Sequence, residues 1–351
     1  MIRSIGLLLF YIVLTSWAHA QTPKRGRLVT EKIISEILKE NRINLDVNRS
    51  VNVYLPPGYD ASRKSYPVVY YFHSIFTKAN QIFDDGAVSL LDRAYTNGIT
   101  NEFIFVAADF SSPTIGSLYE NSPVSGRWLD FIVNELVPFI DNKYRTIRHR
   151  DSRAVMGHFM GGRGALKLVM THAETFGAAY AMHPVATGNG YMPWALISLD
   201  WKKVFTAKTF DDVGNAKIFV AVGQAFSPNL GRPPLYGDFI CEPGTNGEPQ
   251  ANTTNILKLK TGFHLEETLN ESAVNLRTLR GLAFDWGRFD ANQDHVSANR
   301  AFSRKLYDLG VEHEAEEYSG DPWSKVWTAN GRFYTRVLPF FAQHLVFEDK
   351  K

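Results

Sequence analysis

The chain has 351 residues, of which 44% are hydrophobic and 21% are charged. This composition is typical of a folded protein with one large or two modest cores, and it excludes an intrinsically disordered chain. The 38 basic residues nearly balance the 36 acidic ones, which gives a formal net charge of +2. The balance does not favour nucleic acid or an anionic membrane surface as a partner, so a partner has to be inferred from a specific site.

The first twenty residues have the composition of a signal peptide. Arg3 gives a positive start, residues 5–13 form an apolar run too short to cross a bilayer, and Ala18-His19-Ala20 matches a cleavage site of small residues. We therefore expect the mature chain to begin at Gln21 and the protein to be secreted or periplasmic. An uncleaved N-terminal anchor is the alternative, because no later segment has the apolar length of a membrane-spanning helix.

The order of apolar runs predicts the fold class. Residues 50–55 alternate apolar and polar side chains, as an antiparallel strand does, and a turn follows them. Five short, nearly continuous apolar runs read as strands covered on both faces: 66–72, 102–108, 153–157, 177–182 and 282–286. Helical patterns lie between them, at 126–144, 162–171, 296–309 and 332–345. Alternating strands and helices predict an α/β protein with a mostly parallel sheet.

One segment breaks this alternation. Residues 224–265 are rich in proline and glycine and predict a long irregular excursion, which makes 225–265 a cap-like insertion in a single domain spanning 21–351. The preceding segment, 217–224, fits a strand or a helical turn equally well. Cys241 is the only cysteine, so no intramolecular disulfide is possible, and without an adjacent base we expect this thiol to be inert.

Residues 154–164 carry the most informative motif of the chain. The sequence Gly157-His158-Phe159-Met160-Gly161-Gly162 follows a predicted strand and opens a predicted helix, as a nucleophile elbow does. Gly157 and Gly161 allow strand and helix to pack closely around a sharp turn, whose central residue is held in a strained backbone conformation.

With this motif the chain resembles the putative esterase family of α/β hydrolases, which includes enterobactin, feruloyl, acetylxylan and esterase D-like enzymes and whose motif is G-H-S-M-G-G. The resemblance extends, in order, over VNVYLPPGY at 51–59, VVYYFH at 68–73, NELVPFIDNKY at 134–144, the elbow and VLPFF at 337–341. It implies an α/β-hydrolase fold, and in the family it goes with ester hydrolysis by a Ser-His-Asp triad.

Position by position, the resemblance assigns only one member of the triad. Phe159 stands at the nucleophile position, and a phenyl ring offers neither an oxygen nor an ionisable proton. Asp290 stands at the acid position. Pro322 stands at the histidine position, where it cannot act as a base, and an alignment shifted by one residue would place Asp321 there.

The remaining assignments concern the oxyanion hole and the pocket. The resemblance places the oxyanion and elbow positions at Ser74, Met160, Gly157 and Gly161, with His73-Ser74 replacing the usual His-Gly. Residues expected near the pocket are His73, Asp109, His183, His295, Trp286 and Trp323. A metal site made of His73, His183 and Asp290 is not expected, because no ligand spacing supports it, and no cofactor is implied.

Two functional hypotheses follow from these assignments. The first is a secreted member of the esterase family that is silent as a serine hydrolase and binds a small ester or glycan-like ligand. The second is an active hydrolase of carbohydrate or phenolic esters that uses an unrecognised nucleophile or a water molecule activated by Asp290 or His295. Nucleic acid is not an expected partner of either, and a purely structural interaction protein has no positive feature in the sequence.

Overall fold

The computed structural model describes residues 25–188 and 199–348. The predicted leader, with its cleavage after Ala20, lies outside the described residues. Within the described part of the chain, no helix combines the length and the apolar character that a membrane crossing requires.

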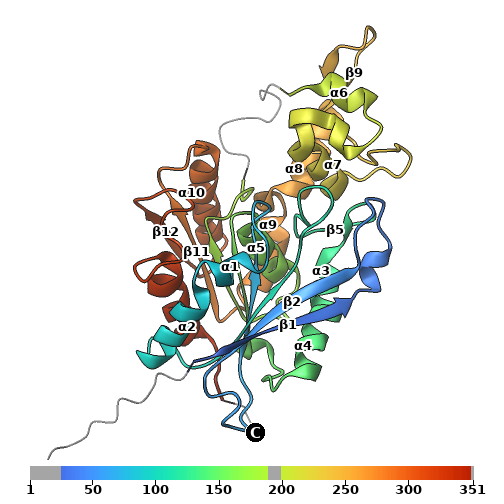
Figure 1. Ribbon diagram of the computed structural model, residues 1–351. Coiled ribbons are helices and arrows are strands. Elements are labelled where there is room, and N and C mark those ends of the chain that lie inside the picture. The colour runs from blue at the N-terminus through green and yellow to red at the C-terminus, as the bar shows by residue number, and fades with distance from the viewer. Residues whose placement is uncertain (1–24, 189–198, 349–351) are drawn as a thin grey trace, which may run out of the picture.

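A central sheet of eight strands organises the molecule (Figure 1). Its spatial order is β1, β2, β4, β3, β7, β8, β11, β12. Strands β1, β2 and β4 pair antiparallel, and all pairs from β4 through β3 to β12 are parallel. The mostly parallel α/β architecture is therefore confirmed. The strands are β1 (Arg27–Ile34), β2 (Asn48–Leu55), β3 (Val68–Phe72), β4 (Ile104–Ala108), β7 (Arg153–His158), β8 (Ala178–Met182), β11 (Gly281–Gly287) and β12 (Glu314–Tyr318).

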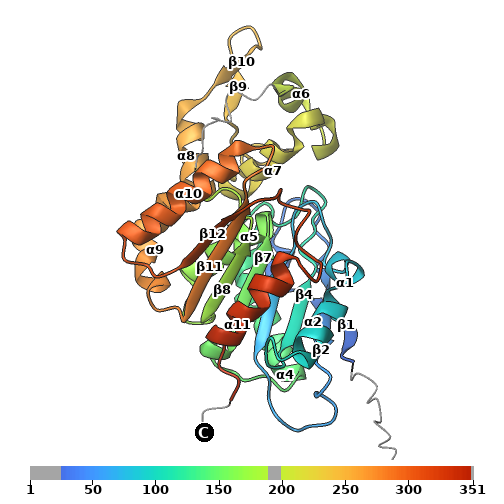
Figure 2. The ribbon, with the colours of Figure 1, turned by 90° about the vertical axis from the view of Figure 1, so that its left-hand side faces the viewer.

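Helices cover both faces of the sheet (Figure 2). One face packs against α2 (Ala87–Thr96), the π-helical turn η7 (Phe333–Val337) and α11 (Leu338–His344). The other face packs against α3 (Trp128–Phe131), η2 (Ile132–Leu136), α4 (Val137–Lys143), α5 (Met160–Thr171), α9 (Leu269–Leu276) and α10 (Gln293–Asp308). Short elements complete this part of the chain: η1 (Ile37–Lys39), α1 (Gln81–Asp84), β5 (Asn121–Ser122), β6 (Gly126–Arg127), η3 (Arg150–Ser152) and η6 (Leu265–Thr268).

Two sheet strands have no apolar run in the sequence. Strand β1 exposes every second side chain, and β12 reads Glu-Ala-Glu-Glu-Tyr. Both lie at the edges of the sheet, where side chains meet water. An edge strand needs no continuous apolar sequence, and charges there discourage pairing with another chain.

The excursion is irregular only in part: residues 227–240 form turns and loops, and regular elements that the sequence did not predict follow them. It contains a hairpin of β9 (Cys241–Pro243) and β10 (Pro249–Ala251), followed by helix α8 (Thr253–Phe263). The undecided segment is helix α7 (Lys217–Phe226), which packs on α8 and on η5 (Phe210–Ala216), and η5 in turn contacts α6 (Trp201–Thr206). We call residues 201–263 the cap. Figure 1 shows the cap at one end of the molecule. The apolar side chains of its helices are buried against one another. The high proline and glycine content of the sequence obscures this order.

Candidate functional site

The turn between β7 and α5 has the strained geometry expected of an elbow. Phe159 lies between the last residue of β7, His158, and the first of α5, Met160, with φ 58° and ψ −114°. A bulky residue rarely adopts a positive φ, and such strain costs on the order of 1–3 kcal/mol. The backbone N–H of Phe159 donates to the carbonyl of Met182 at 3.0 Å, which ties the turn to the end of β8.

The two elbow glycines are required by close backbone contact. A Cβ on Gly157 would lie 2.0 Å from the carbonyl oxygen of Gly161, and a Cβ on Gly161 would lie 2.0 Å from that of Phe72. Real Cβ atoms do not approach a backbone atom so closely. Strand β7, helix α5 and the end of β3 therefore meet at a distance that only glycine permits.

Four rings surround the phenyl ring of Phe159. His183 lies nearly parallel to it at 6.0 Å between ring centres, and His295 presents an edge at 5.3 Å. Trp323 lies at 5.1 Å and Phe76 at 5.8 Å. Aromatic pairs contribute about 0.5–1.5 kcal/mol each, so the four contacts together are large enough to offset the strain of the turn.

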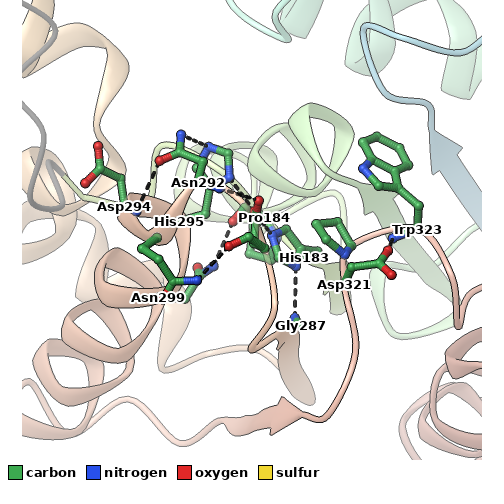
Figure 3. A network of polar contacts seen from close by, with 12 residues as sticks. His183, Pro184, Gly287, Asn292, Asp294, His295, Asn299, Asp321 and Trp323 are labelled. Atoms are coloured by element: carbon green, nitrogen blue, oxygen red, sulfur yellow. Dashed lines mark hydrogen bonds and ion pairs between the residues drawn. The ribbon is translucent and has the colours of Figure 1, made fainter. Parts of the chain in front are cut away.

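Asp290 is the centre of the polar network beside this ring. Figure 3 shows members of this network, among them His183, Asn292 and His295. Its carboxylate is 8% exposed, and Oδ2 accepts hydrogen bonds from His183 Nε2 and from His295 Nδ1, each at 2.7 Å. Oδ1 accepts from the backbone N–H of Asn292 at 2.8 Å. Burial alone would raise the pKa of Asp290, but the hydrogen bonds from the two histidines and from Asn292 hold it well below its usual range. The carboxyl group is therefore ionised at neutral pH.

The hydrogen-bond partners fix the tautomers of both histidines. Nδ1 of His183 accepts from the backbone N–H of Gly287 at 2.9 Å, so its proton sits on Nε2 and points to Asp290. His295 donates from Nδ1 to Asp290, which leaves Nε2 as an acceptor. The Asn292 amide donates to that nitrogen at 3.2 Å, while its Oδ1 accepts from the N–H of Asp294 and caps helix α10.

Metal binding is one chemistry to test for this cluster. The nearest ligand atoms of His183, Asp290 and His295 lie within 4.8 Å of one another. A neutral imidazole binds a metal through a nitrogen that carries no proton. His183 Nε2 carries its proton, because Nδ1 accepts from Gly287. The donor set therefore does not fit a metal ion, and the network is one of hydrogen bonds.

The loop that holds Pro322 is bound to the elbow through its backbone. The carbonyl of Pro322 accepts from His158 Nε2 at 2.8 Å, and burial lowers the pKa of His158 to about 4, so this histidine is neutral. Asp321 accepts from the backbone N–H groups of Trp323 and Ser324, which makes it a turn residue. Trp323 belongs to this turn, and its ring contacts the rings of Phe159 and His158.

Other residues expected near the pocket have structural roles elsewhere. His73 is buried, with Nδ1 bonded to the carbonyl of Ser74 and Nε2 accepting from the N–H of Phe110. Asp109 pairs with Arg49 at 3.1 Å. The indole N–H of Trp286, on β11, donates to the carboxylate of Glu317, on β12.

Two of the oxyanion and elbow candidates lie close to the ring. Met160 lines the cavity described next, together with Phe159. Ser74 is fully buried, and its Oγ accepts from the N–H of Phe76, which itself contacts Phe159.

A largely apolar cavity of about 260 Å³ adjoins the Phe159 ring. Its walls come from the elbow, from the loop after β8, from the start of α10 and from the cap: Ile75, Phe76, Phe159, Met160, Val185, Ala186, Gly188, Ile218, Phe219, Val222, Phe263, His264, Asn292, Asp294, His295 and Ala298. The sequence predicted a cap-like insertion at 225–265, which supplies Phe263 and His264 to this wall, but it did not predict the contribution of α7. The apolar spacing of Ile218, Phe219 and Val222 along α7 is the signal that indicates it.

The family comparison matches residues 43–228 to the model described as "Putative esterase". The match includes the elbow and the end of β8.

Two curated relatives each match somewhat more than a third of this chain at moderate identity. An esterase of Mycobacterium tuberculosis is 36% identical over 138 residues, which cover 38% of this chain and 28% of that protein. Endo-1,4-beta-xylanase Y of Acetivibrio thermocellus is 31% identical over 126 residues, which cover 35% of this chain and 10% of the relative. The chain thus spans less than a third of the length of these relatives.

Solved structures share the fold over nearly the whole chain. A ferulic acid esterase superimposes with a TM-score of 0.61 at 20% identity, covering 92% of this chain and 99% of its own. An S-formylglutathione hydrolase from Agrobacterium tumefaciens gives a TM-score of 0.59 at 15% identity, covering 93% and 98%. The α/β-hydrolase fold expected from the resemblance is confirmed.

Proposed function

This chain belongs to the putative esterase family, and we propose that it departs from the family's chemistry: it does not hydrolyse esters through a serine, and it binds a small, mostly apolar molecule. The observation that carries the proposal is Phe159. It keeps the strained elbow conformation while presenting a phenyl ring where an acyl-enzyme needs an oxygen nucleophile.

The surroundings of Phe159 support this proposal. Its ring contacts the rings of both histidines that hold Asp290, so it occupies the space between the elbow and the polar network. In a working triad this space belongs to the hydrogen bond between nucleophile and base. Pro322, at the position where the resemblance places the base, contributes a backbone carbonyl to His158.

The cavity supports the binding half of the proposal. Its wall is dominated by aliphatic and aromatic side chains, with polar groups confined mainly to the start of α10 and the end of α8, as in small-molecule sites. The similar proteins are an esterase, a xylanase and a ferulic acid esterase, and their activities favour a small ester or glycan-like ligand.

One observation favours an active hydrolase as the second candidate. Asp290 orients His295 so that Nε2 is an acceptor, and His295 lines the cavity. In that mechanism His295 Nε2 takes a proton from water while the oxygen attacks an ester carbonyl, and the proton then passes to the departing alcohol. No covalent enzyme intermediate is formed.

The two candidates are separated by assaying protein that begins at Gln21 with p-nitrophenyl acetate and a fluorophosphonate label. We expect the wild type to stay unlabelled and its turnover to be unchanged by Asp290→Asn. The double variant Phe159→Ser/Pro322→His should be labelled and should gain about 10²-fold in turnover, a typical contribution of a general base. Adding Asp290→Asn should remove that gain.

Each contrary result has a distinct meaning. Wild-type turnover that falls with both Asp290→Asn and His295→Ala, without labelling, would establish the activated-water mechanism. Labelling of the wild type would reveal another nucleophile. A double variant that folds and gains nothing would show that the nucleophile or histidine position is wrongly assigned.

Export is part of the proposal, supported by the composition of residues 1–20. Mass spectrometry of the protein recovered from its producing cells should give an N-terminus at Gln21. A chain that retains residues 1–20 would favour the uncleaved anchor.

A further inference from the structure

The polar end of the cavity has a defined hydrogen-bonding character. His295 Nδ1 donates to Asp290, so His295 Nε2 accepts. Its present donor is the amide of Asn292, at the long distance of 3.2 Å. Asn292 is exposed, so its amide can bond to water when a ligand replaces it. A ligand group that takes the place of the Asn292 amide therefore has to donate a hydrogen bond to His295 Nε2.

The electrostatic character of the cavity disfavours anions. Asp294 lines it, and ionised Asp290 lies directly behind His295. The other lining histidine, His264, is neutral, because burial and then nearby Arg163 lower its pKa to about 4. Among the described residues that line the cavity there is no lysine or arginine. A ligand carboxylate would meet the side chain of Asp294 in the wall and the charge of Asp290 behind His295, with no lysine or arginine among the described lining residues.

The volume limits the apolar part of the ligand. An apolar cavity of about 150 Å³ is large enough to bind benzene. The 260 Å³ here therefore admits one ring and a short chain. Phe76 and Phe159 contact each other on one wall, and Phe219 and Phe263 belong to the wall formed by the cap, so flat apolar groups have several partners.

We propose that the cavity binds a neutral, single-ring apolar molecule that carries one hydroxyl group, with the hydroxyl donating to His295 Nε2, and that it discriminates against the corresponding carboxylate. This inference rests on the binding role proposed above and adds the chemical class of the ligand. His295, the residue that activates water in the alternative mechanism, then serves as the acceptor that orients a ligand.

The test compares three molecules of the same skeleton by calorimetry on the wild-type protein at pH 7.5: 3-phenylpropan-1-ol, 3-phenylpropanoate and propylbenzene. We expect the alcohol to bind at least 10-fold more tightly than the carboxylate, and about 5-fold more tightly than the hydrocarbon, as one hydrogen bond allows.

Two variants test which residues cause the expected differences in affinity between the three molecules. His295→Phe removes the acceptor and keeps an aromatic ring, so it should bind the alcohol and the hydrocarbon equally, and retained propylbenzene binding shows that the cavity is intact. Asp294→Asn removes one carboxylate from the cavity wall and should tighten binding of 3-phenylpropanoate several-fold relative to binding of the alcohol. His149→Phe, at an exposed histidine outside the cavity, is the matched control and should change nothing.

The outcomes separate this inference from the proposed function. Equal binding of alcohol and carboxylate by the wild type, or a preference for the alcohol over propylbenzene that survives in His295→Phe, overturns the ligand class while the cavity remains a binding site. Binding of none of the three molecules overturns the ligand class together with the apolar binding role. The esterase and labelling assays test the loss of serine chemistry independently of either result.

Discussion

The elbow and the loop that carries Asp290 differ in what holds each of them in place. At the elbow, residues 157–161 keep the backbone, with its glycines and strained turn, and place a phenyl ring at its centre. In the acid loop, residues 287–295 keep the carboxylate and surround it with histidines from the loop after β8 and the start of α10. The elbow combines a strained backbone with an apolar side chain, whereas the acid loop combines a buried charge with hydrogen-bond donors from distant segments.

This difference shows what each region contributes to the folded chain. The elbow glycines lie against the backbone of neighbouring elements, so the packing of β3, β7 and α5 depends on them whatever residue occupies position 159. The Asp290 carboxylate is buried and needs its donors to remain charged. Both features are therefore maintained by folding energetics, and neither by itself implies catalysis.

The largest effect is expected from Gly161→Ala. The new Cβ would meet the carbonyl of Phe72 at 2.0 Å, and backbone cannot move aside as a flexible side chain does. We expect a loss of about 3 kcal/mol or more in the free energy of unfolding, at the upper end of overpacking effects, measured by urea denaturation.

Gly247→Ala is the matched control for this change. Gly247 has φ 77° and no atom near the position of a new Cβ. The variant should therefore lower the free energy of unfolding only by the cost of placing alanine at a positive φ, about 1–2 kcal/mol. Equal losses in the two variants would show that close backbone contact does not define the elbow.

An intermediate effect is expected from Asp290→Asn. Loss of the charged acceptor should lower the free energy of unfolding at pH 7 by about 2 kcal/mol. The folded-state pKa is below the unfolded value of about 4, so this stabilisation is complete above that value and is lost as the pH falls below it. The difference between wild type and variant should therefore narrow below about pH 4 in urea denaturation series.

Asp308→Asn provides the control, because this aspartate is exposed at the end of α10 and pairs with Arg304 on the surface. It should stay within about 0.5 kcal/mol of the wild type at every pH. If the effect of Asp290→Asn on the free energy of unfolding does not depend on pH between 2.5 and 7, the inference that Asp290 is ionised within this network is wrong.

The smallest effect is expected from Trp323→Ala. The indole is 44% exposed but packs on Phe159 and His158, so its removal should cost about 1 kcal/mol in thermal unfolding experiments. Tyr307→Ala, on an exposed side chain of α10, should cost less. A loss in Trp323→Ala no greater than in Tyr307→Ala would mean that the aromatic cluster does not offset the strain at Phe159.

The sequence by itself determined the buried strands, the helices between them and the elbow. Continuous apolar runs are needed wherever a strand is covered on both faces, and the glycine spacing at 157 and 161 reflects close packing of strand on helix. The family resemblance placed Asp290 at the acid position, and His183 and His295 were named individually among the residues expected near the pocket.

Only the tertiary structure decided how these residues combine. His183 and Asp290 are separated by 107 residues, and no local pattern records that Gly287 directs the His183 proton toward the carboxylate. The edge strands β1 and β12 and the ordered cap were missed for a related reason: their stability comes from pairing and burial against distant segments. Local sequence reports local periodicity and backbone constraints, whereas hydrogen-bond direction and cavity shape arise where separate segments meet.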